Sequence, residues 1–198
     1  MRSSRVAIIT LLLLLACIAT ATAMTGEDAI DKAVAAEEVL DDLPEEVEAL
    51  TELTPTETTE TIDGVEYTVT TYTDPETGKT LKRMTDPDGN VVKEEFFDPE
   101  TGTLVTTEYD QAGKVASNTV ETVDEAGKVM ESTKIEYNQD GTKTYTTIDY
   151  TESADNKVTT VVAAGGDITN PDDIISQDVE TEPIEHTCPN TGQSEINL

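Results

Sequence analysis

The residues that could do chemistry in this chain are acids, threonines and tyrosines, because the usual catalytic side chains are scarce. His186 is the only histidine and lies in a polar C-terminal tail, so neither a Ser-His-Asp nor a Cys-His arrangement can form on the body of the protein. Carboxylates are abundant, but a general acid needs an apolar pocket to raise its pKa. With two phenylalanines and no tryptophan, the composition predicts a protein that is not an enzyme.

One short segment has the oxygen-ligand spacing of a calcium loop. Asp86, Asp88 and Asn90 place carboxylate and amide oxygens on alternate residues, as calcium loops do. Gly89 comes too early for an EF-hand, and no glutamate stands at the twelfth position. The segment is therefore a weak calcium candidate, with a plain turn as the alternative, and calcium is the one cofactor that the sequence suggests.

Six tyrosines are the candidate contacts for a macromolecular partner. Tyrosine joins an apolar ring to a polar hydroxyl and suits half-hydrated interfaces. The alternative interpretation is that these rings form the modest core of a sheet. The six are Tyr67, Tyr72, Tyr109, Tyr137, Tyr145 and Tyr150.

The elements that must position these residues are short strands separated by acid–glycine turns between residues 62 and 163. Each turn opens with Asp or Asn, whose side chain can bond to backbone amides ahead of it, and most close on Gly, which accepts the left-handed conformation. The runs between turns are rich in Thr, Val, Tyr and Ile and are typical of strands. We expect an antiparallel meander of about eight short strands, as a single layer or an open barrel. The turns open at residues 74, 86, 98, 110, 124 and 138.

An aromatic–Asp or aromatic–Asn pair opens several of these turns. The stretches are Phe97-Asp98 through Leu104, Tyr109-Asp110 through Val115 and Tyr137-Asn138 through Gly141. This pattern resembles the YD-repeat (RHS-like) family and related short β-hairpin repeats, over about residues 70–160. The resemblance implies a β-hairpin architecture in an extracellular setting and transfers no active site. The chain lacks the family's recurrent arginine before the tyrosine and has too few repeats for a large enclosing shell.

Residues 1–23 have the organisation of a secretory signal peptide. Arg2 and Arg5 precede an apolar run, and Ala21-Thr22-Ala23 supplies the small residues of a cleavage site. The apolar run is shorter than the ~20 residues of a spanning helix, so no transmembrane span is expected after cleavage. Cys17 lies in a stretch that resembles the lipobox of bacterial lipoproteins, and lipid anchoring there is the alternative to secretion.

Residues 24–61 are predicted to form an acidic helix followed by a Thr/Glu-rich linker, and residues 164–198 a disordered acidic tail. Within the helix, small and apolar residues recur at alternating spacings of four and three, the pattern of an amphipathic helix or a coiled coil. Pro44 interrupts this pattern and is read as the start of a second short helix. The stripe consists of Ala29, Ala33, Ala36, Leu40, Leu43, Val47 and Leu50.

The formal net charge of −30 makes nucleic acid an improbable partner and favours cations or basic surfaces. Only Cys188 would remain after signal cleavage, so no intrachain disulfide is expected. The sequence predicts a secreted or surface-exposed, non-enzymatic interaction or structural protein that presents a repetitive β-sheet to a macromolecular partner. An acidic, calcium-binding matrix protein is the alternative, and the oligomeric state is left open.

Overall fold

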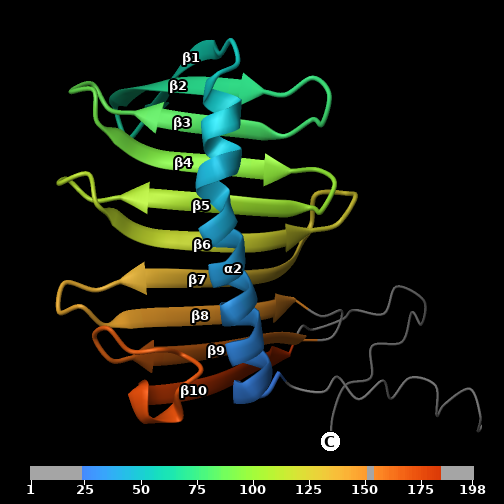
Figure 1. Ribbon diagram of the computed structural model, residues 1–198, viewed down its shortest axis with the longest axis vertical. Helices are drawn as coiled ribbons and strands as arrows, with labels where there is room; N and C mark the ends of the chain where they lie inside the picture. Colours follow the sequence, from blue (N-terminus) through green and yellow to red (C-terminus); the bar gives the residue numbers. More distant parts are fainter. Residues whose placement is uncertain (1–23, 151–153, 184–198) are drawn as a thin grey trace, which may run out of the picture.

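The computed structural model describes residues 24–150 and 154–183, in which one long helix crosses an antiparallel sheet of ten strands (Figure 1). Strand order follows chain order, and every neighbouring pair is antiparallel, so the sheet is an open meander. The predicted class, mainly β with an N-terminal helix, is confirmed, but the expected count of about eight strands is too low.

The helix is α2 (Gly26–Thr51). The strands are β1 (Thr56–Ile62), β2 (Val65–Thr73), β3 (Thr80–Thr85), β4 (Val91–Asp98), β5 (Thr103–Tyr109), β6 (Val115–Val123), β7 (Val129–Tyr137), β8 (Lys143–Tyr150), β9 (Ala154–Val162) and β10 (Ile174–Pro183). A short 3₁₀ helix, η2 (Pro171–Asp173), precedes β10.

The hairpins close with the acid–glycine chemistry that the sequence predicts. In the turn between β5 and β6, the amide of Asp110 donates to the carbonyl of Lys114 at 2.8 Å, and the amide of Gly113 donates back to the Asp110 carbonyl at 2.9 Å. The Asp110 carboxylate also accepts from the amides of Ala112 and Lys114. Gly113 has a φ of 74°, the left-handed conformation that ends such a loop with a bulge. The same pair of backbone bonds closes the turns that open at Asp86, Asp124 and Asn138.

The strand β1 corrects the predicted Thr/Glu-rich linker. Thr56–Ile62 pairs in full register with β2 through a two-residue turn at Asp63 and Gly64. All seven residues of β1 are exposed, so the strand gains its stability from backbone bonds to β2 and from the β-propensity of threonine. Because neither face of such an edge strand is buried, its sequence has no alternation of apolar and polar residues from which a strand could be predicted.

The strand β10 corrects the predicted disordered tail over residues 164–183. The Asn170 side chain accepts from the amide of Asp172 and starts η2 at Pro171, so the proline that suggests a break begins a turn instead. The chain then pairs with β9 along the whole of β10. The rest of the predicted tail, residues 184–198, lies outside the described residues.

The helix packs its apolar stripe on one face of the sheet, as an amphipathic helix does. Thr25 and Asp28 form a reciprocal capping box at its start. It continues through Pro44 to Thr51 without a break, so the expected second helix is a continuation of the first. Figure 1 shows α2 running across the strands from the β10 end toward the β1 end.

The core is the contact between α2 and one face of the sheet. In its N-terminal half α2 presents alanine: Ala33 packs with Ile135 and Tyr145, and the small side chain lets the helix backbone approach the strands. In its C-terminal half Leu50 packs with Leu81 and Phe96. The layer of side chains between the helix and the sheet is therefore thinner over β7–β9 and thicker over β3–β5.

Hydroxyl and amide groups are also buried on this face, and several are bonded to each other. The Thr107 hydroxyl donates to Asn118 Oδ1 at 2.9 Å, and Asn118 Nδ2 donates to the Tyr137 hydroxyl at 3.0 Å. Because these groups find partners, their burial carries little penalty. The sheet can therefore hold threonine and asparagine where a larger protein would place aliphatic side chains.

Replacing Gly102 by alanine should destabilise the fold more than the same change at Gly113. Both have similar positive φ angles, 68° and 74°, which cost alanine about 1–2 kcal/mol. At Gly102 the new Cβ would also lie 2.4 Å from the carbonyl oxygen of Val123, whereas at Gly113 it would meet nothing. We expect an additional loss of about 1–3 kcal/mol for Gly102→Ala in thermal melts followed by circular dichroism. Equal losses for the two variants would contradict the close approach of the two hairpins.

Enlarging Ala33 should lift the helix from the sheet. Ala33 is fully buried and Ala35 is exposed on the same helix. We expect Ala33→Leu to lower the free energy of unfolding by about 1–3 kcal/mol through overpacking, and Ala35→Leu to change it by less than about 0.5 kcal/mol. Denaturant titration measures both, and an unaffected Ala33→Leu variant would mean that α2 does not lie on the strands.

Candidate interaction surface

The sheet has a covered face, on which α2 lies, and an open face on the opposite side. Register and the alternation of side chains assign each strand residue to one face. A row of four threonines and one lysine crosses the middle of the open face on five adjacent strands, and all five side chains are partly exposed. We call this row the hydroxyl ladder, after its threonines; it consists of Thr106, Thr119, Lys134, Thr146 and Thr159.

Charges on the open face are nearly balanced over its eight central strands, whereas the edge strands β1 and β10 add the acids Glu60, Asp178 and Glu180 to it. Over β2–β9 it carries four lysines and five acids, and Lys93 pairs with Glu95 at 2.6 Å and Lys134 with Glu136 at 2.9 Å. By contrast, α2 carries ten acids and one lysine. The open-face lysines are 82, 93, 134 and 157, and the acids are 95, 108, 121, 136 and 155.

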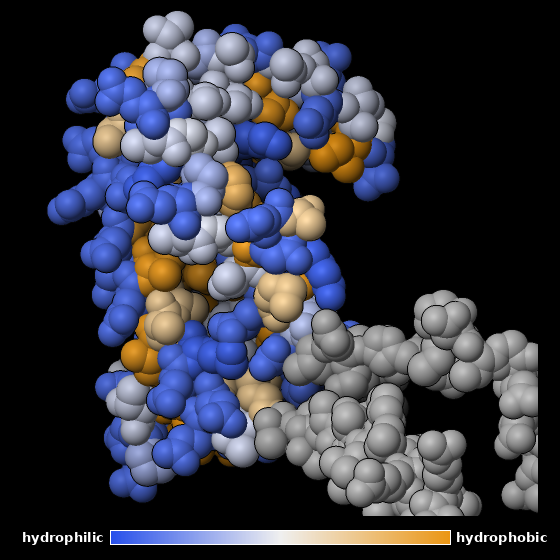
Figure 2. Space-filling view, turned by 90° about the vertical axis from the view of Figure 1, so that its right-hand side faces the viewer, coloured by the Kyte–Doolittle hydropathy of each residue, from blue (hydrophilic) through white to orange (hydrophobic). Residues whose placement is uncertain are grey.

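Apolar side chains lie on the open face at two places beside the hydroxyl ladder. Phe97 and Leu104 are cross-strand neighbours at one side. Val69 and Met84 are neighbours at the other, near the β1 end, and line a hollow of about 190 Å³. Figure 2 shows the open face in profile on the right, hollowed below the end that carries β1 and β2. The face therefore combines apolar, hydroxyl and paired charged groups.

The six tyrosines are divided between the two faces. Tyr67 and Tyr150 are partly exposed on the open face. The other four lie on the covered face, where Tyr145 is 2% exposed beneath α2 and donates to Glu37 Oε1 at 2.7 Å. Burial, reinforced by the bond to Glu37, raises the pKa of Tyr145 to about 12. Tyr145 is thus a core residue, while Tyr67 and Tyr150 remain candidate contacts.

Two further tyrosines of the covered face take part in polar clusters beside α2. Tyr109 donates to Glu94 Oε2 at 2.5 Å, and Arg83 bonds to the other oxygen of Glu94. Burial, followed by the bond to Glu94, raises the pKa of Tyr109. Tyr137 accepts from Asn118, and its ring lies 5.9 Å from the Lys143 ammonium. Their hydroxyls are therefore engaged within the protein.

The calcium candidates form a hairpin turn. Asp86 Oδ1 accepts from the amides of Asp88 and Asn90, and Asp86 Oδ2 accepts from Asn90 Nδ2. The Asn90 side chain, followed by these amides, lowers the pKa of Asp86. Within residues 24–150 and 154–183, no three His, Cys, Asp or Glu side chains are grouped as a metal site would need. Calcium binding by Asp86, Asp88 and Asn90 stays a prediction.

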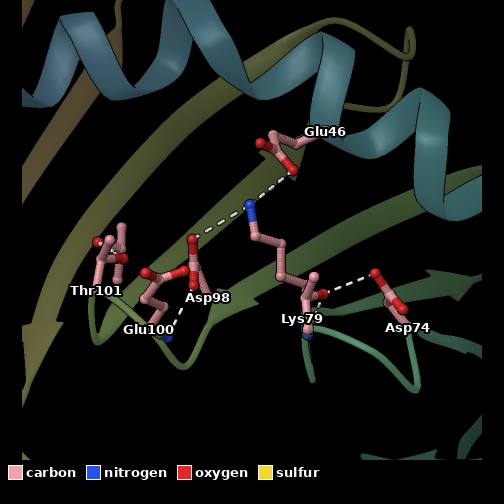
Figure 3. A network of polar contacts seen from close by, with 8 residues as sticks. Glu46, Asp74, Lys79, Asp98, Glu100 and Thr101 are labelled. Atoms are coloured by element: carbon pink, nitrogen blue, oxygen red, sulfur yellow. Dashed lines mark hydrogen bonds and ion pairs between the residues drawn. The ribbon is translucent and has the colours of Figure 1, made fainter.

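Lysine bridges fix the position of α2 over the sheet. Figure 3 shows Lys79 reaching from the β2–β3 turn to Glu46 of the helix, at 2.9 Å, with Asp98 at 3.3 Å on its other side. The bond to Glu46 is the main cause that raises the pKa of Lys79. Lys79 was not identified as a functional residue from the sequence. A lysine that follows the glycine of a turn gives no sign that it pairs with a helix residue 33 positions earlier. The three bridges are Lys32–Glu131, Lys79–Glu46 and Lys143–Glu37.

The predicted signal peptide, with the lipidation candidate Cys17, and the residues around His186 and Cys188 lie outside the described residues. Of the helices in the described part of the chain, none has the length and apolar character needed to cross a bilayer.

The stability of the turn at Asp86 should depend on pH. Because the folded pKa of Asp86 is below its ordinary value of 3.8, its bonds stabilise the protein fully above that value and are lost as the pH falls through the lower folded pKa. Asparagine would keep an acceptor oxygen without titrating, and Asn138 opens a turn that has the same two backbone bonds. We therefore expect the melting midpoint of Asp86→Asn to fall less than that of the wild type between about pH 5 and pH 2.5. Asp88→Asn, which removes a charge from the same turn, should keep the wild-type slope; equal slopes for both variants would contradict the assignment.

No family model, curated protein or solved structure matches this chain. The resemblance to YD-repeat proteins is therefore neither supported nor contradicted. The aromatic–Asp and aromatic–Asn pairs that carry it do open hairpin turns, but Phe97 lies on the open face and Tyr109 and Tyr137 on the covered face. The three pairs are thus not equivalent in this fold.

Proposed function

We propose that this chain is an exported, non-enzymatic structural and interaction module whose open face docks against the open face of a second copy. The observation that carries the proposal is the near balance of charge over the central strands β2–β9 of that face, in a chain whose net charge is −30. The hydroxyl ladder lies at the centre of the interface, and α2 stays on the outside of each copy.

Electrostatic repulsion between two copies is expected to be weaker at the open face than at the helix side. Two molecules of charge −30 repel each other, and the repulsion is strongest where the acids of α2 face solvent. Over β2–β9 of the open face, four lysines oppose five acids and several are paired within one copy. The further acids of this face, Glu60, Asp178 and Glu180, lie on the edge strands β1 and β10. Self-association therefore meets least repulsion when the open faces meet and the helices point away.

The size and chemistry of the open face also support an interface. Eight strands at about 4.8 Å spacing, with about seven residues each, give roughly 800 Å², which is the area that each partner buries in a specific complex. Apolar groups such as Phe97, Leu104 and Met84 alternate with hydroxyls, as at half-hydrated interfaces. Two such sheets pack at about 10 Å separation.

Export and the lack of catalysis rest on the sequence. The segment 1–23 has the order of a signal peptide, and the described residues contain neither histidine nor cysteine. Cleavage before Cys17 would anchor the same module to a bacterial membrane by a lipid, and partitioning of the native protein into detergent distinguishes the two routes.

Making the open face acidic should abolish the dimer. In Thr119→Glu/Thr146→Glu, both glutamates flank Lys134 across the strands, so they form favourable pairs within one copy. The centre of the face nevertheless becomes more negative by two charges in each copy, and the two copies repel each other there. We expect the wild type, residues 24–198, to dimerise with a micromolar dissociation constant in sedimentation velocity, and this variant to bind at least about tenfold more weakly.

The control adds the same charge away from the open face. Thr68→Glu/Ala35→Glu changes exposed residues of the covered face and of α2 and should dimerise as the wild type does. A wild type that sediments as a monomer at every concentration up to several hundred micromolar, or equal losses in the two variants, would overturn the proposal.

A further inference from the structure

Two hollows lie between the C-terminal half of α2 and the hairpin ends of β2–β5, on either side of the Lys79–Glu46 bridge. The first has a volume of about 320 Å³ and is formed by the end of α2 and the β2–β3 turn. It combines apolar residues of the helix and of the segment just after it with acids from the helix and the turn. The apolar residues are Ala49, Leu50 and Leu53, and the acids are Glu46, Asp74 and Glu76.

The second hollow, of about 230 Å³, lies one helical turn earlier, between α2 and the β4–β5 hairpin. It repeats the chemistry of the first, with apolar walls and carboxylates from both sides. The apolar residues are Val39, Leu43 and Phe96, and the acids are Asp42, Glu46 and Asp98.

Lys79 lines both hollows and is the cation common to them. It is already engaged, since its ammonium bonds to Glu46 and lies beside Asp98 (Figure 3). The acids that Lys79 does not pair with are Asp74 and Glu76 in the first hollow and Asp42 in the second. Such an excess attracts a further cation, and the apolar walls favour one that is carried on a hydrocarbon stem.

We propose that the two hollows bind the arginine or lysine side chains of a basic segment in a partner protein. The methylene stem of such a residue packs on apolar surface while its charged head reaches carboxylates at the entrance. Hollows of this size suit single long side chains, being at or below the lower limit of sites for whole small-molecule ligands. The occupant is argued from this charge complementarity.

The acidic outer surface of α2 assists this binding. Exposed carboxylates continue along the helix beside the hollows, at Glu45 and Glu48 among others. They raise the local concentration of a basic partner and its association rate, in a manner that salt weakens. The hollows lie on the covered side of the sheet, so the open face stays free and this inference does not depend on the proposed dimer.

The test is a titration of ¹⁵N-labelled residues 24–198 with the peptide acetyl-Gly-Arg-Gly-Arg-Gly-amide, followed by NMR. We expect saturable binding with a dissociation constant below about 1 mM. The shifted amides should lie at the hollows, for example at Ala49, Leu53 and Thr101. The same peptide with glutamate in place of arginine should cause no shifts.

The chain itself offers a matched pair of variants. Glu76 and Glu100 occupy the same position in two copies of Asp-Pro-Glu-Thr-Gly, but only Glu76 lines one of these two hollows. Glu76→Gln should weaken binding of the peptide by about tenfold, and Glu100→Gln by less than about twofold. Neither carboxylate supports a hydrogen bond of the turn, which is held by Asp74 and Asp98.

A second pair lies on the helix. Glu46→Gln, at the boundary of both hollows, should weaken binding at least as much as Glu76→Gln. Glu48→Gln, on the exposed surface of α2, removes only long-range attraction and should weaken binding by less than about twofold. Equal losses within each pair, or shifts that spread along α2 without saturation, would show diffuse attraction to an acidic protein and would overturn the proposal.

Discussion

The structure depends on the contact between one helix and one face of the sheet. A 26-residue helix is about 39 Å long, and ten strands span about 43 Å, so α2 is just long enough to cross the meander. It supplies the second layer that a sheet requires to bury apolar side chains. Because alanine lines one half of the contact and leucine the other, the helix follows a sheet whose covered face is polar at one end and apolar at the other.

This contact explains where the charge of the protein lies. A helix that packs by a narrow stripe leaves most of its circumference in water, and here that surface is occupied by carboxylates. Three lysines, from the helix, a hairpin turn and a strand, form bridges that involve only part of these acids. Nearly all the basic side chains of the described residues lie on the strands and their turns. The two sides of the protein differ in charge because only one face of the sheet is covered by the acidic helix.

Turn chemistry is what the sequence conveys best, because each acid–glycine turn is specified by residues that are neighbours in the chain. The meander follows from those turns. The edge strands β1 and β10 were not predictable, since an exposed edge needs no apolar pattern, and Asn170-Pro171 looks like a break when read alone. The faces of the tyrosines were also hidden: bulges such as the one beside Tyr109 shift the register, and a shift of one residue exchanges the two faces of a strand.

The Lys79 region shows why the candidate site could not be read from the chain. Asp74 and Asp98 open identical pentapeptides, so by local pattern their turns are equivalent. The turns differ in the fold: Asp98 pairs with Thr103 in the strand ladder, whereas Asp74 bonds to Lys79 across a longer turn. At the β2–β3 turn the end of α2 also brings Glu46 to Lys79 and Leu53 beside Glu76. Glu100, in the other pentapeptide, instead lines a hollow between two hairpin ends. The repeated sequence thus produces several similar hairpin turns, and the turns that α2 contacts have different surroundings from the turns that it does not contact. A sheet of repeated hairpins that is covered by a single helix can in this way have a surface at one hairpin that the other hairpins lack, although the hairpin sequences are alike.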